Sequence, residues 1–97
     1  MSDFDVIHEQ HEGHGRFVIH LDGDHEAKMT YTETAPGVVA IEHTLVPPEF
    51  RGQNIAAQLV EKGVRELANS GKKIVPVCSY VVLQFRRHKD WQQYLAG

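Results

Sequence analysis

Residues 46–60 read VPPEFRGQNIAAQLV and mark the point where the spacing of apolar residues along the chain changes. Downstream of this point, apolar residues recur at the spacing of an amphipathic helix, at Ile55, Leu59, Val60, Val64, Leu67 and Ala68. Gly71 follows Ser70 and is typical of the position just past a helix end. The stretch therefore predicts a loop of small residues that leads into a helix.

The residues before this loop predict strands separated by turns. Apolar and polar residues alternate through 17–21 and 27–32, and a further strand follows over 38–46. A weaker strand over 5–10 precedes them, and turn residues stand at 12–15, at Asp22-Gly23-Asp24 and at Pro36-Gly37. We expect these four strands to form an antiparallel meander.

A short apolar strand over Ile74–Cys78 follows the helix. A strand, a helix and a second strand at this separation imply a right-handed crossover into parallel pairing. Residues 81–88 indicate a second helix and 91–95 a terminal turn or short helix, with Trp91 in the core or at a dimer contact. The predicted fold class is α+β, a mostly antiparallel sheet with one parallel pair, in a single domain over residues 1–97.

The composition narrows the classes of function. Ten Lys and Arg against thirteen Asp and Glu give a net charge of −3, which argues against a nucleic-acid or anionic-membrane binder. Eight of the ten basic residues follow residue 50, which suits a small polyanionic ligand. Cys78 is the single cysteine, and the chain has neither a signal peptide nor a membrane-length apolar run, so we expect a cytoplasmic protein. A chain this short buries little apolar surface, and a homodimer would bury more.

The loop before the helix is the most informative stretch for function. The free amides at a helix N-terminus carry partial positive charge and bind anions. Small residues at Gly52, Ala56 and Ala57 allow a ligand close to the backbone, and Arg51 adds a permanent positive charge. Neither a Walker lysine pair nor a G-x-G-x-x-G run is present. The pattern indicates a pyrophosphate site, while a loop shaped only by packing stays open as the alternative.

This loop resembles the motif [Arg/Gln]-x-x-[Gly/Ala]-x-[Gly/Ala] of the GNAT N-acetyltransferases, with Arg51 as its first residue and Ala56 as its last. The wider string HTLVPPEFRGQNIAAQLV is similar to a small single-domain, YjdJ-like group of GNAT-like proteins. The resemblance implies a reduced GNAT-like fold without the usual helices between the first two strands. It implies acetyl-CoA as cofactor, bound by Leu45, Val46, Arg51, Gly52, Gln53, Asn54, Ile55 and Ala56.

Asn54 departs from the motif, which usually has glycine there. Asparagine tolerates the left-handed backbone region better than most residues, so we expect the loop shape to survive. The helices missing from this group normally help to build the acceptor pocket, so the resemblance does not identify the amine, peptide or protein that accepts the acetyl group.

Four residues are candidates for the chemistry of acetyl transfer. Glu42 and His43 are neighbours on the fourth strand, so we expect only one of them to face the cleft as a base. Cys78, at the end of the fifth strand, is a candidate acyl carrier, and Tyr80 a candidate acid for the departing thiolate. For each of the four, a packing or solvent-facing role stays open.

Other polar clusters are less specific. Arg86, Arg87 and His88 are candidates for contact with the cofactor 3′-phosphate, although a solvated helix face explains them as well. Three histidines at a spacing of three, His8, His11 and His14, alternate faces on a strand and do not predict a metal site.

Together, the loop and its resemblance to the GNAT motif predict an acetyl-CoA-dependent N-acetyltransferase. A non-catalytic acyl-CoA sensor and a ligand-free interaction domain are the alternatives.

Overall fold

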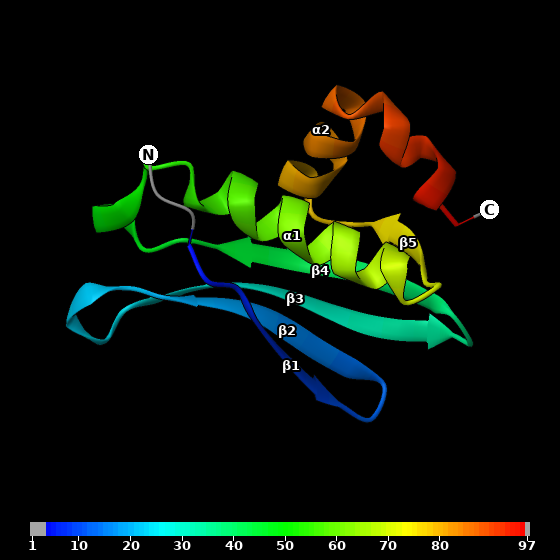
Figure 1. Ribbon diagram of the computed structural model, residues 1–97, viewed down its shortest axis with the longest axis horizontal. Helices are drawn as coiled ribbons and strands as arrows, with labels where there is room; N and C mark the ends of the chain where they lie inside the picture. Colours follow the sequence, from blue (N-terminus) through cyan, green and yellow to red (C-terminus); the bar gives the residue numbers. More distant parts are fainter. Residues whose placement is uncertain (1–3, 97) are drawn as a thin grey trace.

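The computed structural model describes residues 4–96, which form one mixed sheet with helices on one of its faces (Figure 1). The five strands lie in the order of the chain: β1 (Ile7–His11), β2 (His14–His20), β3 (Glu26–Ala35), β4 (Val38–Leu45) and β5 (Lys73–Pro76). The chain also forms two α-helices, α1 (Ile55–Asn69) and α2 (Ser79–Arg87), and three short 3₁₀ turns, η1 (Asp22–Asp24), η2 (Pro48–Phe50) and η3 (Lys89–Tyr94).

The pairing of the strands confirms the predicted topology. Strands β1 to β4 pair antiparallel in sequence order, and β4 pairs parallel with β5 after the crossover through α1. The turn at Glu12-Gly13 joins β1 directly to β2, so no helix lies between the first two strands. The fold is therefore the reduced α+β arrangement that the sequence indicates.

The prediction was wrong about where the fifth strand ends. The strand stops at Pro76 rather than at Cys78, because the amides of both Val77 and Cys78 donate to the single carbonyl of Ile41, at 3.0 and 3.1 Å. Two successive amides on one carbonyl turn the chain out of the ladder. Helix α2 accordingly begins at Ser79, two residues earlier than predicted, with Cys78 at its N-cap.

The core lies between the sheet and the two helices. Side chains of β2, β3 and β4 pack against the apolar stripe of α1, and side chains of α2 and η3 complete the core. The largest fully buried side chains are Trp91, Phe17, Ile19, Met29, Ile41 and Ile55. Trp91 is 2% exposed and packs edge-on against Phe85, so it belongs to the core. Among residues 4–96, neither helix has the length and apolarity that a membrane span requires.

Strand β1 lies at one edge of the sheet and is tied to α1 by His8. The His8 ring stacks on Phe17 at 4.1 Å, hydrogen-bonds the Tyr31 hydroxyl at 2.6 Å through Nε2, and pairs through Nδ1 with Glu66 of α1. Just before β1, the Lys62 Nζ of α1 donates to the Phe4 carbonyl at 2.7 Å. The edge strand is therefore held to the helix as well as to β2.

Candidate functional site

The loop between β4 and α1 has the unusual backbone that its small residues predict. After η2, Gly52 has φ 84° and Asn54 has φ 64°, both in the left-handed region. Asn54 is the N-cap of α1, and its side chain makes no capping hydrogen bond. Asparagine is among the few non-glycine residues that adopt this region readily, which explains why it is tolerated where the motif usually has glycine.

The first turn of α1 leaves its amides free. None of the backbone N–H groups of residues 52–57 donates a backbone hydrogen bond within residues 4–96; the first that does is Gln58, to the Asn54 carbonyl at 3.2 Å. The first turn carries no acidic side chain. Free amides and the positive end of a helix dipole are the features that anion sites at helix N-termini use.

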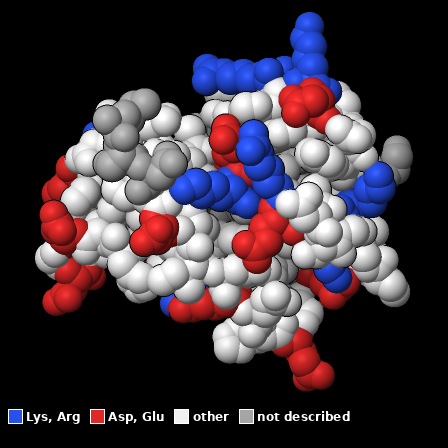
Figure 2. Space-filling view, viewed as in Figure 1, with Lys and Arg blue, Asp and Glu red and all other residues white. Residues whose placement is uncertain are grey.

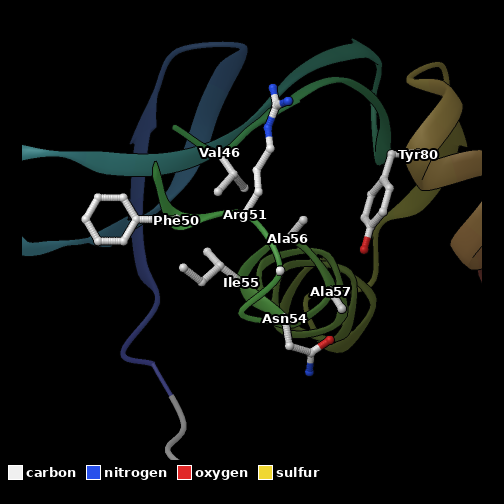
Figure 3. A pocket seen from close by; sticks show the side chains of 9 residues that line it. Val46, Phe50, Arg51, Asn54, Ile55, Ala56, Ala57 and Tyr80 are labelled. Atoms are coloured by element: carbon white, nitrogen blue, oxygen red, sulfur yellow. The ribbon is translucent and has the colours of Figure 1, made fainter. Parts of the chain in front are cut away.

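A pocket of about 240 Å³ lies against these amides (Figure 3). It is lined by residues 50–57 except Gln53, together with Val46 of the preceding segment and Tyr80 of α2. In Figure 3, Tyr80 faces the first turn of α1 with its hydroxyl end toward the helix, while Asn54 points away from Val46. The Asn54 side chain therefore points away from the side of the pocket that Val46 lines.

A second pocket of about 370 Å³ continues from the first toward β4. The two share four lining residues, Val46, Arg51, Ala56 and Tyr80, and the second also contacts Thr44 and Leu45. Ile41 is the last residue of β4 that pairs with β5, so β4 runs on from Glu42 to Leu45 without β5 at its side. The pocket therefore lies where the two parallel strands diverge.

Cys78 lies next to this divergence. Its Sγ is 3.9 Å from the Thr44 Oγ1, and the side chain is half-buried. Burial raises the pKa of the Cys78 thiol, but the amides of Val81 and Tyr80 and the contact with Thr44 outweigh it, so the pKa is lowered overall. A lowered pKa increases the fraction of reactive thiolate at neutral pH.

Tyr80 lines both pockets and keeps its proton. Burial raises the pKa of its hydroxyl above the ordinary value, and the opposing effects of Arg87 and Gln84 are smaller. At neutral pH the phenol is therefore a hydrogen-bond donor and a proton source at the pocket wall.

Glu42 and His43 do not point to opposite faces, so that expectation was wrong. The register of β3 and β4 shifts between Thr30 and Tyr31, where Glu42 is the extra residue of a β-bulge, and His43 pairs with Thr30. Glu42 accepts a hydrogen bond of 3.0 Å from the Thr32 hydroxyl. Thr30 and Thr32 alternate with the buried Met29 and Tyr31, so both Glu42 and His43 lie on the face away from the helices.

Arg86, Arg87 and His88 do not line either pocket. Arg86 and Arg87 are exposed at the end of α2, and the ring of His88 stacks on Trp91 at 3.9 Å. In Figure 2, Lys and Arg side chains project from the side of the molecule with α2, and Asp and Glu lie at the end with the β2–β3 turn, while both signs are mixed over the middle of this face.

The histidines of the first two strands do not converge. His11 and His14 stack across the β1–β2 turn at 5.4 Å, while His8 faces α1 and the Tyr31 hydroxyl. Within residues 4–96, no three side chains of the metal-ligating types come together.

The family model of the GCN5-related N-acetyl-transferases matches residues 16–94. The chain belongs to the GCN5-related N-acetyltransferase family. This match spans both helices, the whole loop at the start of α1, and all of the sheet except β1 and the first two residues of β2.

Two solved structures share the fold of this chain. A GCN5-like protein from Staphylococcus aureus, provisionally assigned as an N-acetyltransferase, aligns at 26% identity and a TM-score of 0.71 over 100% of this chain and 92% of its own. The ribosomal-protein-alanine N-acetyltransferase from Brucella melitensis biovar Abortus 2308 shares the fold at 20% identity and a TM-score of 0.57, over 91% of this chain and 67% of its own. No curated protein matches the sequence.

Within this GCN5-related site, sequence reasoning missed Thr44 and Phe50, while it noted Ala57 as a small residue beside the ligand. Phe50 immediately precedes the quoted motif and could have been included from its position alone. Thr44 could not, because strict alternation from Ile41 would turn it away from the helices. The bulge at Glu42 reverses that alternation and brings Thr44 to the pocket and to Cys78.

Proposed function

We propose that this chain binds acetyl-CoA with its pyrophosphate on the loop at residues 51–56 and transfers the acetyl group to an amine. One observation supports this most strongly: the amides of residues 52–57 have no backbone acceptor within residues 4–96 and stand at a helix N-terminus beside Arg51. A diphosphate supplies the acceptors that these donors lack.

The second pocket suits the rest of the cofactor. A pantetheine arm is a flexible chain with amide groups, and beyond Ile41 the backbone of β4 has no β5 partner, so Leu45 and Val46 can offer main-chain groups to it. An arm that extends from the helix N-terminus along this pocket brings its thioester toward Thr44 and Cys78. An amide of Leu45 or Val46 near the carbonyl would stabilise the oxyanion.

In the direct route, the neutral amine attacks the thioester carbonyl, a C–N bond forms and the C–S bond breaks. Glu42 or His43 accepts the proton that the amine loses, and Tyr80 donates one to the departing thiolate. In the route through Cys78, its thiolate first attacks the thioester carbonyl and takes the acetyl group, and Tyr80 protonates the departing CoA thiolate. The neutral amine then attacks the acetylated Cys78, loses its proton to Glu42 or His43, and regenerates the Cys78 thiolate.

Calorimetric titration with acetyl-CoA and free CoA tests the binding. Arg51→Ala should weaken acetyl-CoA binding roughly tenfold, because a hydrogen bond to a charged group contributes about 1.5 kcal/mol. Arg65→Ala, which removes another exposed arginine on α1, is the matched control and should leave the affinity unchanged. If millimolar CoA produces no binding heat, the proposal fails.

Mass spectrometry and turnover distinguish the two routes. After incubation with acetyl-CoA, an acetyl adduct on Cys78 that disappears when amine is added supports the covalent route. Cys78→Ser with full turnover excludes that route and leaves the direct attack. Binding without transfer to any amine would instead identify a non-catalytic acyl-CoA sensor.

A further inference from the structure

The segment that joins β4 to the start of α1 is not tied to the sheet by its backbone. Within the described part of the chain, residues 46–53 take part in only two backbone hydrogen bonds. Both are local: Phe50 donates to the Pro47 carbonyl at 2.9 Å, and the residue after it donates to the Pro48 carbonyl at 3.3 Å. These bonds shape the 3₁₀ turn η2 but do not determine where it lies. The position of the segment therefore depends on side-chain contacts.

Phe50 makes the contact of this segment that lies nearest to the cofactor loop, residues 51–56. Together with Val46, its side chain packs against the core. Phe50 also lines the first pocket, and in Figure 3 it lies on the opposite side of the start of α1 from Tyr80. Arg51 follows Phe50 directly in the chain. The place of Phe50 therefore determines where the cofactor loop begins.

A residue of another hairpin contacts Phe50 from outside the segment. The ring of His25 meets the Phe50 ring edge-on, with the two centroids 5.4 Å apart. The Nε2 of His25 also lies 3.9 Å from the Glu49 Oε2. Figure 1 shows the β2–β3 turn, which ends at His25, at the same end of the molecule as η2. His25 thus touches two successive residues of η2.

The β2–β3 turn limits the orientation of His25. Gly23 and Asp24 have left-handed backbones, with φ 73° and 64°, and the Leu21 amide donates to the His25 carbonyl at 2.8 Å. A Cβ added to Gly23 would lie 3.5 Å from the Cδ2 of His25, so the ring packs over its own turn. Within the described chain, Asp24 and Asn54 are the two non-glycine residues in the left-handed region. The two loops that meet at the His25 contact therefore both hold a conformation that L-residues rarely adopt.

We infer that His25 is a positioning residue for the cofactor loop, because it holds Phe50 and η2 where Arg51 and the following amides can receive the pyrophosphate. The inference rests on the proposed function, since it concerns the same loop. His25 lines neither pocket, so it acts through Phe50 rather than on the cofactor. A loop that is in place for only part of the time lowers the apparent affinity by that fraction.

Calorimetric titration of the full-length protein with acetyl-CoA tests the inference. His25→Ala should raise the acetyl-CoA Kd about three- to tenfold, which is the range that an aromatic pair contributes to an equilibrium. His25→Phe keeps an aromatic edge against Phe50 and should bring the Kd back to within about twofold of the wild type. In ¹⁵N-labelled protein without ligand, His25→Ala should shift the amide resonances of residues 50–54 and not those in the second half of α1.

Two further variants separate this role from a general effect of losing a histidine. His14→Ala is the matched control, because His14 is an exposed histidine of the other hairpin turn and its ring contacts that of His11, also at 5.4 Å. It should leave the acetyl-CoA Kd unchanged. In a Phe50→Ala background, His25→Ala should have no further effect on the Kd, because the ring through which it acts is gone.

Two outcomes overturn the inference and leave the proposed function intact. If His25→Ala binds acetyl-CoA as tightly as the wild type, the loop is positioned without His25. If His25→Ala weakens binding equally with and without Phe50, or if His25→Phe fails to restore the affinity, His25 does not act through the ring contact. A wild type that binds no acetyl-CoA is, in contrast, the failure of the proposed function itself, and the inference fails with it.

Discussion

Gly52→Ala isolates the contribution of the loop backbone to cofactor binding. Gly52 has φ 84°, and a Cβ added there would meet no atom within 4 Å. The substitution therefore introduces no clash, and its entire effect is the unfavourable left-handed conformation of an L-residue, about 1–2 kcal/mol.

This free energy must appear in one of two measurements. If the loop keeps its shape without ligand, the free energy of unfolding falls by about 1–2 kcal/mol and the acetyl-CoA affinity is unchanged. If the loop relaxes without ligand, stability is preserved, and binding must restore the strained shape, which lowers the affinity about 5- to 30-fold. The two losses together should equal about 1–2 kcal/mol.

Urea denaturation and calorimetry on the same variant measure both terms. Gly37→Ala is the matched control, because Gly37 has φ 75° in the β3–β4 turn and its added Cβ also meets nothing within 4 Å. It should lower the free energy of unfolding by about 1–2 kcal/mol and leave the acetyl-CoA affinity unchanged. If Gly52→Ala changes neither stability nor affinity, the left-handed loop is not the bound conformation and the reasoning is refuted.

Three further predictions concern titration and packing. The rate of iodoacetamide alkylation of Cys78 should reach half its maximum at a lower pH than for an ordinary thiol, because the surrounding amides and Thr44 lower the pKa of Cys78. Thr44→Val should move this midpoint upward, and a midpoint unaffected by Thr44→Val would contradict the role of that hydroxyl. Trp91→Ala should lower the free energy of unfolding, measured in urea, by about 3–5 kcal/mol, because it leaves a cavity in a fully packed site. A loss below about 1 kcal/mol would place Trp91 outside the core. The amide of Gly37 and the ammonium of Lys72 lower the pKa of the Glu33 carboxyl, so its stabilising effect is present above its unfolded pKa and is lost as pH falls through the folded value. The stability difference between wild type and Glu33→Gln should therefore be constant near pH 7 and decline as the pH falls through the lowered pKa of Glu33, and a difference that does not decline in acid would contradict the assignment.

The sequence was sufficient for the elements whose signals are local. The apolar stripe from Ile55 to Leu67 predicts α1 because a helix repeats every 3.6 residues whatever it packs against. The turn residues Gly23 and Gly37 predict the hairpins because their left-handed conformations strongly favour glycine. The crossover and the parallel pair of β4 and β5 follow from the order of these elements.

The features that were missed depend on the partner strand. The β-bulge at Glu42 is a mismatch of register between β3 and β4, so neither strand contains it alone. The early end of β5 arises because Ile41 accepts two hydrogen bonds from the following chain. Both features lie at the site, and together they bring Thr44 and Cys78 into contact.

The attachment of β1 to α1 through His8 and Lys62 also has a consequence for local opening of the fold. Edge strands usually fray before the rest of a sheet, and their amides then exchange with solvent hydrogen first. Here, detaching β1 requires breaking the contacts of His8 with Glu66 and Tyr31 and of Lys62 with Phe4. Hydrogen exchange in β1 should therefore be as slow as in the second half of α1, so that the two open as one cooperative unit.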